Sequence, residues 1–251
     1  LSWLDALHEQ VVQASFLPQL VALLSSSRTQ VQEQAATVVA DLSTRRELLP
    51  HLVGAGVLMP VVGLLSRGNG QLVDSAVKAM SNLVTVPDAA KGLVDSGRID
   101  CAVPLLSSTS ATTQHNAVLT IGGLVSSVGE RPRFLANGAV ERMLVLLVAE
   151  NLRHDGILYA LGELCEDPSI SEALGRSEPP WAPARAWLVR SVLAGSSDLD
   201  LRRRCAFVLR RVARVQAPPV KAALVHCGAL SSSLELLRQQ EDATLCTDLS
   251  S

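Results

Sequence analysis

The stretch GVLMPVVGLLSRGNGQLVDSAVKAMSNL, from Gly56 to Leu83, contains three sequence markers that recur along the chain. The first marker is the Leu-Leu pair that closes its apolar run. Equivalent pairs, each 41 residues after the last, are Leu23-Leu24, Leu64-Leu65, Leu105-Leu106 and Leu146-Leu147. Two further pairs, Val192-Leu193 and Leu236-Leu237, follow at spacings of 46 and 44 residues. A fixed period of this length is typical of a protein built from stacked helical units.

The other two markers have the same period. Gly56, Gly97 and Gly138 are also 41 residues apart. The third marker is the end of a longer apolar-periodic segment, which reads Val38-Val39-Ala40-Asp41-Leu42, Ala79-Met80-Ser81-Asn82-Leu83 and Thr120-Ile121-Gly122-Gly123-Leu124 in successive units. Because three independent markers share one period, the sequence predicts a true internal repeat.

Each unit reads as three helices. Residues 87–95 and 99–106 are examples of the first and second helices, and a polar turn leads from the second into a third helix of about four turns. In the first third helix Ala36, Val39 and Leu42 fall on one face, as an amphipathic helix requires. The repeating glycine is expected between the first and second helices, where a positive φ allows a sharp turn. One unit cannot bury these faces alone, so neighbouring units must stack.

Composition agrees with packed helices and excludes several functional classes. Of the 251 residues 48% are hydrophobic but only 3% are aromatic, which disfavours a β-sandwich or barrel. A net charge of −2 and a pI near 6.2 argue against general affinity for nucleic acid or anionic membranes. The longest apolar stretch, 52–65, is interrupted by glycine and proline and is too short to insert into a membrane.

Cysteine usage predicts a reducing compartment. The five cysteines are dispersed through apolar helical stretches without a Cys-x-x-Cys pair: Cys101, Cys165, Cys205, Cys227 and Cys246. An odd, scattered set fits free thiols in a cytoplasmic or nuclear protein better than a disulfide framework.

These residues resemble the armadillo repeat, whose pattern has about 42 residues, a glycine before the second helix and an Ala-rich third helix. The segments 20–24 (LVALL) and 81–84 (SNLV), with Ala35-Ala36, carry the resemblance. It implies an all-α fold, a right-handed superhelical solenoid of stacked armadillo units. The predicted divisions are a cap or tail of a preceding unit at 1–14, repeats at 15–55, 56–96, 97–137, 138–176 and 177–227, and a partial repeat at 228–251, all in one domain.

The fifth repeat departs from the pattern through a Pro-rich insertion at 177–183, SEPPWAP. Proline cannot donate to a helix ladder, so this segment must leave the helix or change the packing angle. We expect a loop in which Trp181 or Trp187 fills a gap, with a partner-binding Pro-rich motif as the alternative.

Catalytic and cofactor chemistry has no support in the sequence. The five histidines lie in different units without a second ligand at metal-binding spacing. Gly54-Ala55-Gly56 lacks the third glycine of a dinucleotide loop, and no serine has the Gly-x-Ser-x-Gly context. We therefore expect neither an enzyme, a metal site nor a cofactor.

Binding is expected on the third helices, which line a concave groove in the armadillo family. The resemblance implies a Trp and an Asn on each third helix that grip an extended peptide in importin-α-like relatives. The Trp position reads Thr37, Lys78, Leu119, Tyr159 and Phe207, and the Asn position reads Asp41, Asn82, Gly123, Glu163 and Arg211. Only Asn82 keeps the family residue, so an importin-like grip on basic peptides is not expected.

Charge varies along the expected groove instead. No Asp, Glu, Lys or Arg lies between Asp100 and Glu130, the fourth unit is acidic, and the fifth is rich in arginine. The residues at 204, 207, 211 and 214 share one helical face, and arginine suits bidentate capture of carboxylate or phosphate. One hypothesis is that this stripe binds an acidic or phosphorylated segment of a partner. The other is that its arginines pair with the acidic fourth unit.

The sequence thus predicts a non-enzymatic scaffold or adaptor that binds a protein partner in its concave groove. The alternative is a nucleotide-exchange factor or co-chaperone for a heat-shock ATPase chaperone, since short armadillo arrays occur there and residues 99–106 loosely resemble that group. The oligomeric state stays open. The candidate partner-binding residues are Lys78, Asn82, Asn116, Leu119, Tyr159, Glu163, Arg204, Phe207, Arg211 and Arg214.

Overall fold

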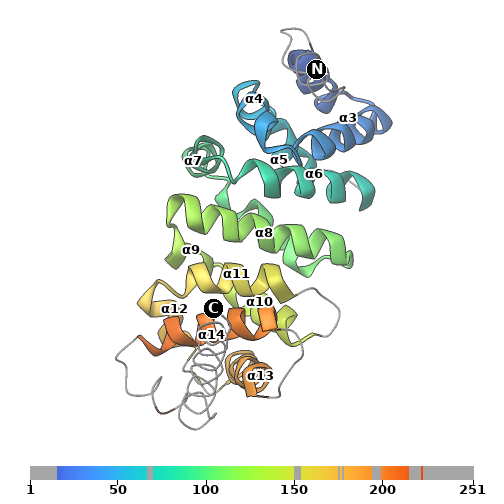
Figure 1. The fold of residues 1–251 in the computed structure, drawn as a ribbon. Helices are drawn as coiled ribbons and strands as arrows, with labels where there is room; N and C mark the ends of the chain where they lie inside the picture. The colour runs from blue at the N-terminus through green and yellow to red at the C-terminus, as the bar shows by residue number, and fades with distance from the viewer. Residues whose placement is uncertain are drawn as a thin grey trace, which may run out of the picture. The chain divides into compact units, whose positions relative to one another are not determined.

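The computed structural model describes residues 16–66, 70–149, 154–174, 176, 178–193, 199–214 and 222 (Figure 1). All regular secondary structure in these ranges is helical, which confirms the all-α class. The chain divides into two compact units, Leu1–Glu130 and Arg131–Ser251, and each is described by itself. The predicted repeat boundaries stay a prediction, and residues 1–14 and 228–251 lie outside the described ranges.

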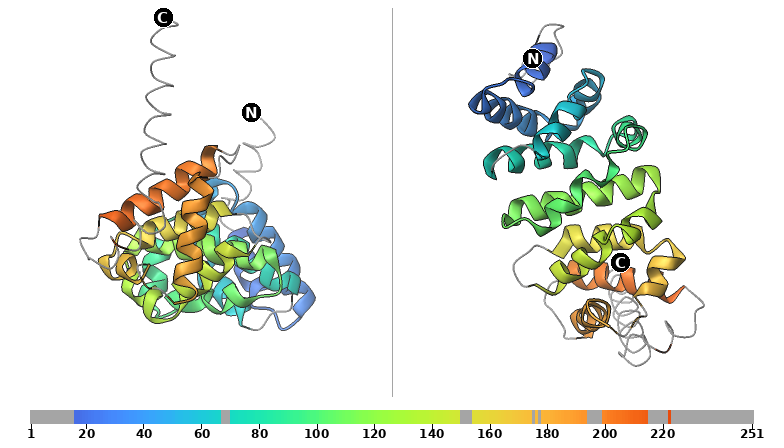
Figure 2. Two further views of the ribbon diagram at one scale, coloured as in Figure 1. Left: turned by 90° about the horizontal axis from the view of Figure 1, so that it is seen from below. Right: turned by 180° about the vertical axis from the view of Figure 1, so that it is seen from behind.

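The first unit follows the expected order of helices. Its elements are α2 (Phe16–Leu24), α3 (Thr29–Leu42), η1 (Arg46–Leu48), α4 (Leu49–Gly54), α5 (Leu58–Leu65), α6 (Gly70–Leu83), α7 (Pro87–Asp95), η2 (Ile99–Ala102), η3 (Pro104–Ser107) and α8 (Ala111–Val128). The bounds of α7 are those predicted from the sequence. The third helices α3, α6 and α8 lie side by side, and this holds when the unit is seen from behind (Figures 1 and 2).

The core of this unit lies between successive third helices. Ala36 and Val39 of α3 and Ala76 and Met80 of α6 are fully buried, as the amphipathic pattern predicts. α6 packs against α3 and α8, and α5 also packs against it. Burial of each aliphatic side chain contributes about 1.5–3 kcal/mol, so the stack is held mainly by apolar contact between neighbours.

The second unit is built in the same way around α11 and α14. Its elements are α9 (Arg131–Ala136), α10 (Ala139–Val148), α11 (His154–Leu164), α12 (Pro168–Ala173), α13 (Trp181–Leu193) and α14 (Leu199–Ala213). α11 and α14 are neighbouring third helices, and α13 packs against α10 and α14. Trp181, in the Pro-rich insertion, is 2% exposed and begins α13, so its indole fills the interior of the unit.

The repeating glycines have the predicted backbone conformation. Gly56, Gly97 and Gly138 adopt φ values of 78°, 68° and 75°, in the left-handed region that side chains disfavour. At Gly97 the chain turns from α7 toward η2, and the amide of Gly97 donates to the carbonyl of Val94 at 2.9 Å. The glycine marker therefore reports a turn geometry and not a ligand site.

The second helix of the third repeat differs from the expectation. Residues 99–106 were expected as one helix, but they form the two 3₁₀ turns η2 and η3. Pro104 has no amide hydrogen to bond the carbonyl of residue 100, so that i→i−4 bond is missing. The carbonyl of Asp100 instead accepts from the amide of Val103 at 3.0 Å, and the turn tightens.

A polar cap at the end of the second helix recurs in three repeats and was not anticipated. The side-chain amides of Gln32 and Gln114 donate to the carbonyls of Leu24 and Leu106, each at 3.3 Å. In the fourth repeat His154, 40 residues after Gln114, hydrogen-bonds to the backbone of Leu147. Each accepting residue is the second member of a Leu-Leu pair. The cap satisfies a carbonyl left without a partner at a helix end.

The described cysteines behave as apolar core groups. Cys165 and Cys205 are buried, and burial raises the pKa of each thiol to about 12. Burial likewise raises the pKa of the half-buried Cys101 thiol to about 11. At neutral pH all three stay protonated and weakly nucleophilic.

Replacement of Gly97 by alanine should destabilise the protein by about 1–2 kcal/mol, because alanine is strained at positive φ. Gly63 is the matched control: it lies within α5, and an added Cβ there meets no atom within 4 Å. Gly63→Ala should leave stability unchanged or raise it by up to about 1 kcal/mol. Urea unfolding followed by circular dichroism measures both. Equal effects of the two substitutions would contradict the assigned turn.

His154 should make the stability of the second unit fall at acid pH. Burial lowers its pKa below 6.5 although the nearby Asp155 carboxylate opposes this, and Nε2 is buried without a partner. The unfolded state therefore binds the proton more readily, and stability is lost as pH falls below about 6.5. His154→Gln keeps a side-chain donor, as in Gln32 and Gln114, but cannot titrate. Urea unfolding of both proteins between neutral and mildly acid pH should show the wild type losing stability relative to the variant.

Candidate functional site

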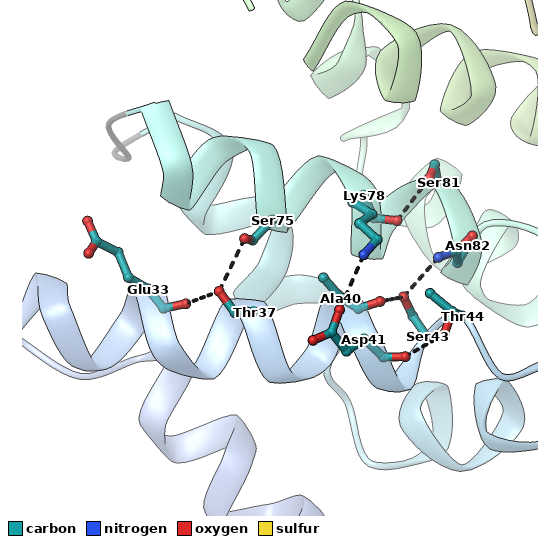
Figure 3. A network of polar contacts seen from close by, with 10 residues as sticks. All are labelled: Glu33, Thr37, Ala40, Asp41, Ser43, Thr44, Ser75, Lys78, Ser81 and Asn82. Atoms are coloured by element: carbon teal, nitrogen blue, oxygen red, sulfur yellow. Dashed lines mark hydrogen bonds and ion pairs between the residues drawn. The ribbon is translucent and has the colours of Figure 1, made fainter. Parts of the chain in front are cut away.

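In the first unit the candidate surface is a row of polar side chains along α3 and α6, shown in Figure 3. Thr37 and Ser75 share a hydroxyl hydrogen bond of 3.3 Å, and Lys78 Nζ lies 3.2 Å from Asp41 Oδ1. We call the six residues that pair across the two helices the α3–α6 row; they are Thr37, Asp41, Ser43, Ser75, Lys78 and Asn82. Four of its members, Thr37, Asp41, Lys78 and Asn82, are the residues that the repeat alignment assigns to the expected groove positions.

Asn82, the one residue that keeps the family identity, hydrogen-bonds to the neighbouring repeat. Its Nδ2 donates to Ser43 Oγ at 3.0 Å, and Ser43 Oγ in turn donates to the carbonyl of Ala40 (Figure 3). The side chains of Lys78 and Asp41 stay 42% and 69% exposed, so their ion pair adds little stability and can yield to a ligand. The row therefore offers exposed charges beside an amide that is already engaged between repeats.

The third helix of the next repeat, α8, presents a less polar face. Asn116 is buried, where its Nδ2 donates to the carbonyl of Thr112 at 3.0 Å, and Leu119 is half-buried. At the Asn position of this repeat, a Cβ on Gly123 would lie 2.9 Å from Val84 Cγ2. Asparagine cannot fit there without displacing Val84, which explains the loss of the family residue.

In the second unit Arg211 of α14 is anchored to the end of α11. Its Nη1 lies 2.6 Å from Glu166 Oε1 and 2.9 Å from the carbonyl of Gly162, and Nη2 lies 3.9 Å from Glu163 Oε1. Arg131 also pairs with Glu166. The Arg211 side chain is only 16% exposed. A cation at the last turn of a helix meets its unpaired carbonyls and the negative end of its dipole, so Arg211 ties the two helices together.

Phe207 lies between α11 and the Arg211 guanidinium. A Cβ on Gly162 would come within 2.9 Å of the Phe207 ring, so the glycine makes room for it. The guanidinium carbon of Arg211 lies 4.5 Å from the ring centroid, and that of Arg210 lies at 5.6 Å. The ring is half-buried. It thus remains partly open to a ligand, with two cations at its face.

The remaining candidate residues are placed more openly. Tyr159 on α11 is 41% exposed, and Arg214 is exposed just after the end of α14. Arg204 Nε lies 3.9 Å from Asp155 Oδ1 across the two helices, with both side chains about half exposed. Pairing of Arg204 and Arg211 with the fourth repeat was one of the two sequence-based hypotheses. That any of these residues binds a partner stays a prediction.

Sequence reasoning did not single out two arginines on the other side of Phe207. Arg203 and Arg210 are both exposed, and on the helical wheel Phe207 separates them from Arg204 and Arg211. The spacing i, i+4, i+7, i+11 of residues 203, 207, 210 and 214 carried that signal. This face was overlooked because residues 204 and 211 also lie near Phe207 on the helical wheel.

Other kinds of site receive no support from the described residues. Within these ranges no group of three or more His, Cys, Asp or Glu side chains could hold a metal ion. In the same ranges no single helix is long and apolar enough to cross a membrane. The segments Arg46–Gly54 and Leu58–Leu65 meet the length and composition criteria together, but they are bent by 90°.

Comparison with known proteins gives one family match. Residues 9–44, which include α2 and α3, match the Armadillo/beta-catenin-like repeat. No curated protein matches the chain. The family match thus covers most of the first predicted repeat, including the segment LVALL at 20–24 and the Ala-rich third helix.

Solved structures of engineered proteins share the fold. A crystal structure titled as an engineered protein is 24% identical, with a TM-score of 0.73 and 88% of each chain covered. A designed armadillo repeat protein in complex with the peptide (KR)4 is 21% identical, with a TM-score of 0.67, covering 81% of this chain and 84% of that one. A protein computationally designed for modular peptide recognition, also 21% identical, gives a TM-score of 0.69 over the same shares. The repeat match identifies an armadillo repeat at residues 9–44, and these likenesses show that the chain shares the armadillo-repeat fold.

Proposed function

We propose that this protein is a non-enzymatic scaffold or adaptor, cytoplasmic or nuclear, that binds a segment of a protein partner on the faces of its third helices. Armadillo repeats are commonly protein-binding scaffolds, and the fold is shared with a designed relative that carries a bound peptide. The observation that carries the proposal is the exposed α3–α6 row. Lys78 and Asp41 are solvent-accessible there, and their weak mutual pair leaves both able to contact a ligand.

The partner segment is proposed to be acidic or phosphorylated where it meets α14. The designed relative binds a peptide of alternating Lys and Arg, whereas the exposed face of α14 in this chain is itself rich in arginine. A basic peptide would be repelled there, and carboxylates or phosphates would be attracted. The difference in charge argues for a partner of opposite sign to that of the designed relative.

Site-specific photo-crosslinking tests the proposal. A benzophenone amino acid is placed at Lys78 on α6, at Tyr159 on α11, or at the control position Lys91, which is exposed on α7 away from the row. In cells, positions 78 and 159 should each crosslink to the same partner, and position 91 should not. Mass spectrometry of the crosslinked peptides identifies both the partner and the segment that it contributes.

The outcome separates the function from its alternative. Equal crosslinking at all three positions would contradict binding on the third helices. A heat-shock ATPase chaperone as the crosslinked partner, released by ATP, would replace the adaptor assignment with that of a nucleotide-exchange factor. Asp41→Lys serves as a second probe. It replaces the partner of Lys78 by a second cation and should weaken retention of the partner protein while α3 stays folded.

A further inference from the structure

The arginines of α14 fall into two groups on either side of Phe207. Arg204 and Arg211 lie on the side that faces α11, where both meet carboxylates of that helix and its end. Arg203 and Arg210 lie on the opposite side, and Arg214 lies nearly in line with Phe207. A single helix thus has one basic edge engaged inside the unit and a second basic edge turned to solvent.

The engaged edge has little charge left for a ligand. The nearest acidic partners of Arg211 are Glu163 and Glu166, and its guanidinium also bonds a backbone carbonyl. Removing such a partly buried cation leaves its anions without a partner, so Arg211 acts as a structural residue. Arg204 is more open; its side chain and that of Asp155, 3.9 Å away, are 47% and 50% exposed, against 61% and 80% for Arg203 and Asp200.

The outer edge keeps its charge. Arg203 forms an ion pair with Asp200 at 3.8 Å, with both side chains more than half exposed, and such a pair is weak in water. Among the described residues, no carboxylate lies within ion-pair distance of Arg210 or Arg214. The Arg210 guanidinium instead lies 5.6 Å from the centroid of the Phe207 ring. The outer edge therefore combines three cations with the half-buried ring of Phe207.

We infer that the outer edge of α14, formed by Arg203, Phe207, Arg210 and Arg214, binds a short extended peptide in which an apolar residue is flanked by acidic or phosphorylated residues. Along the helix these residues span about 16 Å at about 1.5 Å per residue, which matches about five residues of extended peptide at roughly 3.3 Å each. The apolar residue contacts Phe207, and anionic groups on both sides meet the arginines. The inference rests on the proposed function and moves the contact from Arg204 and Arg211 to the outer edge.

A peptide fits these features better than another polyanion. The chain carries a net charge of −2, and acidic side chains of α11 lie beside the arginines, so an extended anionic surface would meet repulsion next to the edge. The half-buried ring of Phe207 offers an apolar contact that a phosphate backbone does not use. The edge is short and mixed in character, as a linear peptide motif requires.

The test uses the full chain and a fluorescent six-residue peptide. Its positions are, in order, an acidic residue, a spacer, leucine, an acidic residue, a spacer and an acidic residue. The acidic residues are glutamate in one version and phosphoserine in the other. Fluorescence anisotropy should show saturable binding that weakens with salt, and replacing the leucine by glycine should weaken it further. The phosphoserine version binding more tightly would assign a phosphorylated source, and equal binding an acidic one. Peptides with lysine at the acidic positions should not bind.

Adjacent arginines provide matched controls. Arg203→Ala and Arg210→Ala should each weaken binding by about three- to tenfold, whereas Arg204→Ala should change it by less than about twofold. Arg210→Lys should restore part of the affinity, and Lys91→Ala, which removes a charge from α7, should have no effect. Arg211→Ala should lower the midpoint of thermal unfolding, while Arg210→Ala should not.

Three results would overturn the inference. Arg204→Ala weakening the peptide as much as Arg203→Ala would return the contact to the edge facing α11. Tighter binding to vesicles of phosphatidylcholine and phosphatidylserine, or to duplex DNA, would make the ligand a polyanion and not a peptide. Peptide binding that appears only after Glu241→Gln and Asp242→Asn would make the chain's own C-terminal segment the occupant. In each case crosslinking at Lys78 still tests the proposed function separately, because that residue belongs to the α3–α6 row.

Discussion

The burial of one third helix against the next is the contact on which the other features depend. Each repeat is too small to cover its own apolar face, so the full burial of Ala36, Val39, Ala76 and Met80 depends on the packing of α3 and α6 against each other and against their other neighbours. This packing fixes which side of each third helix faces solvent. It also brings polar side chains of successive repeats within hydrogen-bonding distance, so the α3–α6 row is a by-product of the stack as much as a candidate binding surface.

The lateral pairing of these groups limits which side chains are free for the proposed recognition of a partner. In the first unit Asn82 and Thr37 are engaged with the neighbouring repeat, and in the second unit Arg211 is held by the end of α11. Side chains at the expected peptide-contacting positions thus bond neighbouring helices and stabilise the stack. In the proposed function, recognition falls to groups on the same helices that the stack leaves open, and the charge of those groups sets the class of partner.

Much of the fold was predictable from the sequence, because the period, the glycine turns and the bounds of α7 depend on local residue pattern. Gly56, Gly97 and Gly138 were placed correctly since only glycine accepts the left-handed turn at no cost. The helix expected at 99–106 was wrong because one missing amide at Pro104 outweighs good apolar spacing. The spacing of the arginines along α14 could be read from the sequence, but which of its two edges is engaged could not. Which arginines are engaged depends on where the end of α11 lies, and a helical wheel drawn for one helix does not contain its neighbour.

The cap on the second helix has a consequence for how such arrays diverge. Gln32, Gln114 and His154 differ in size, shape and acidity, yet each supplies one donor to the carbonyl at the same helix end. This position requires a hydrogen-bond donor, and several kinds of side chain can supply one. Repeats with different residues at this position can therefore share the same hydrogen bond. Substitution at this position can give one repeat a property, such as a titrating ring, that its neighbours lack. A comparison of hydrogen bonds would detect a similarity between repeats that a sequence alignment does not show.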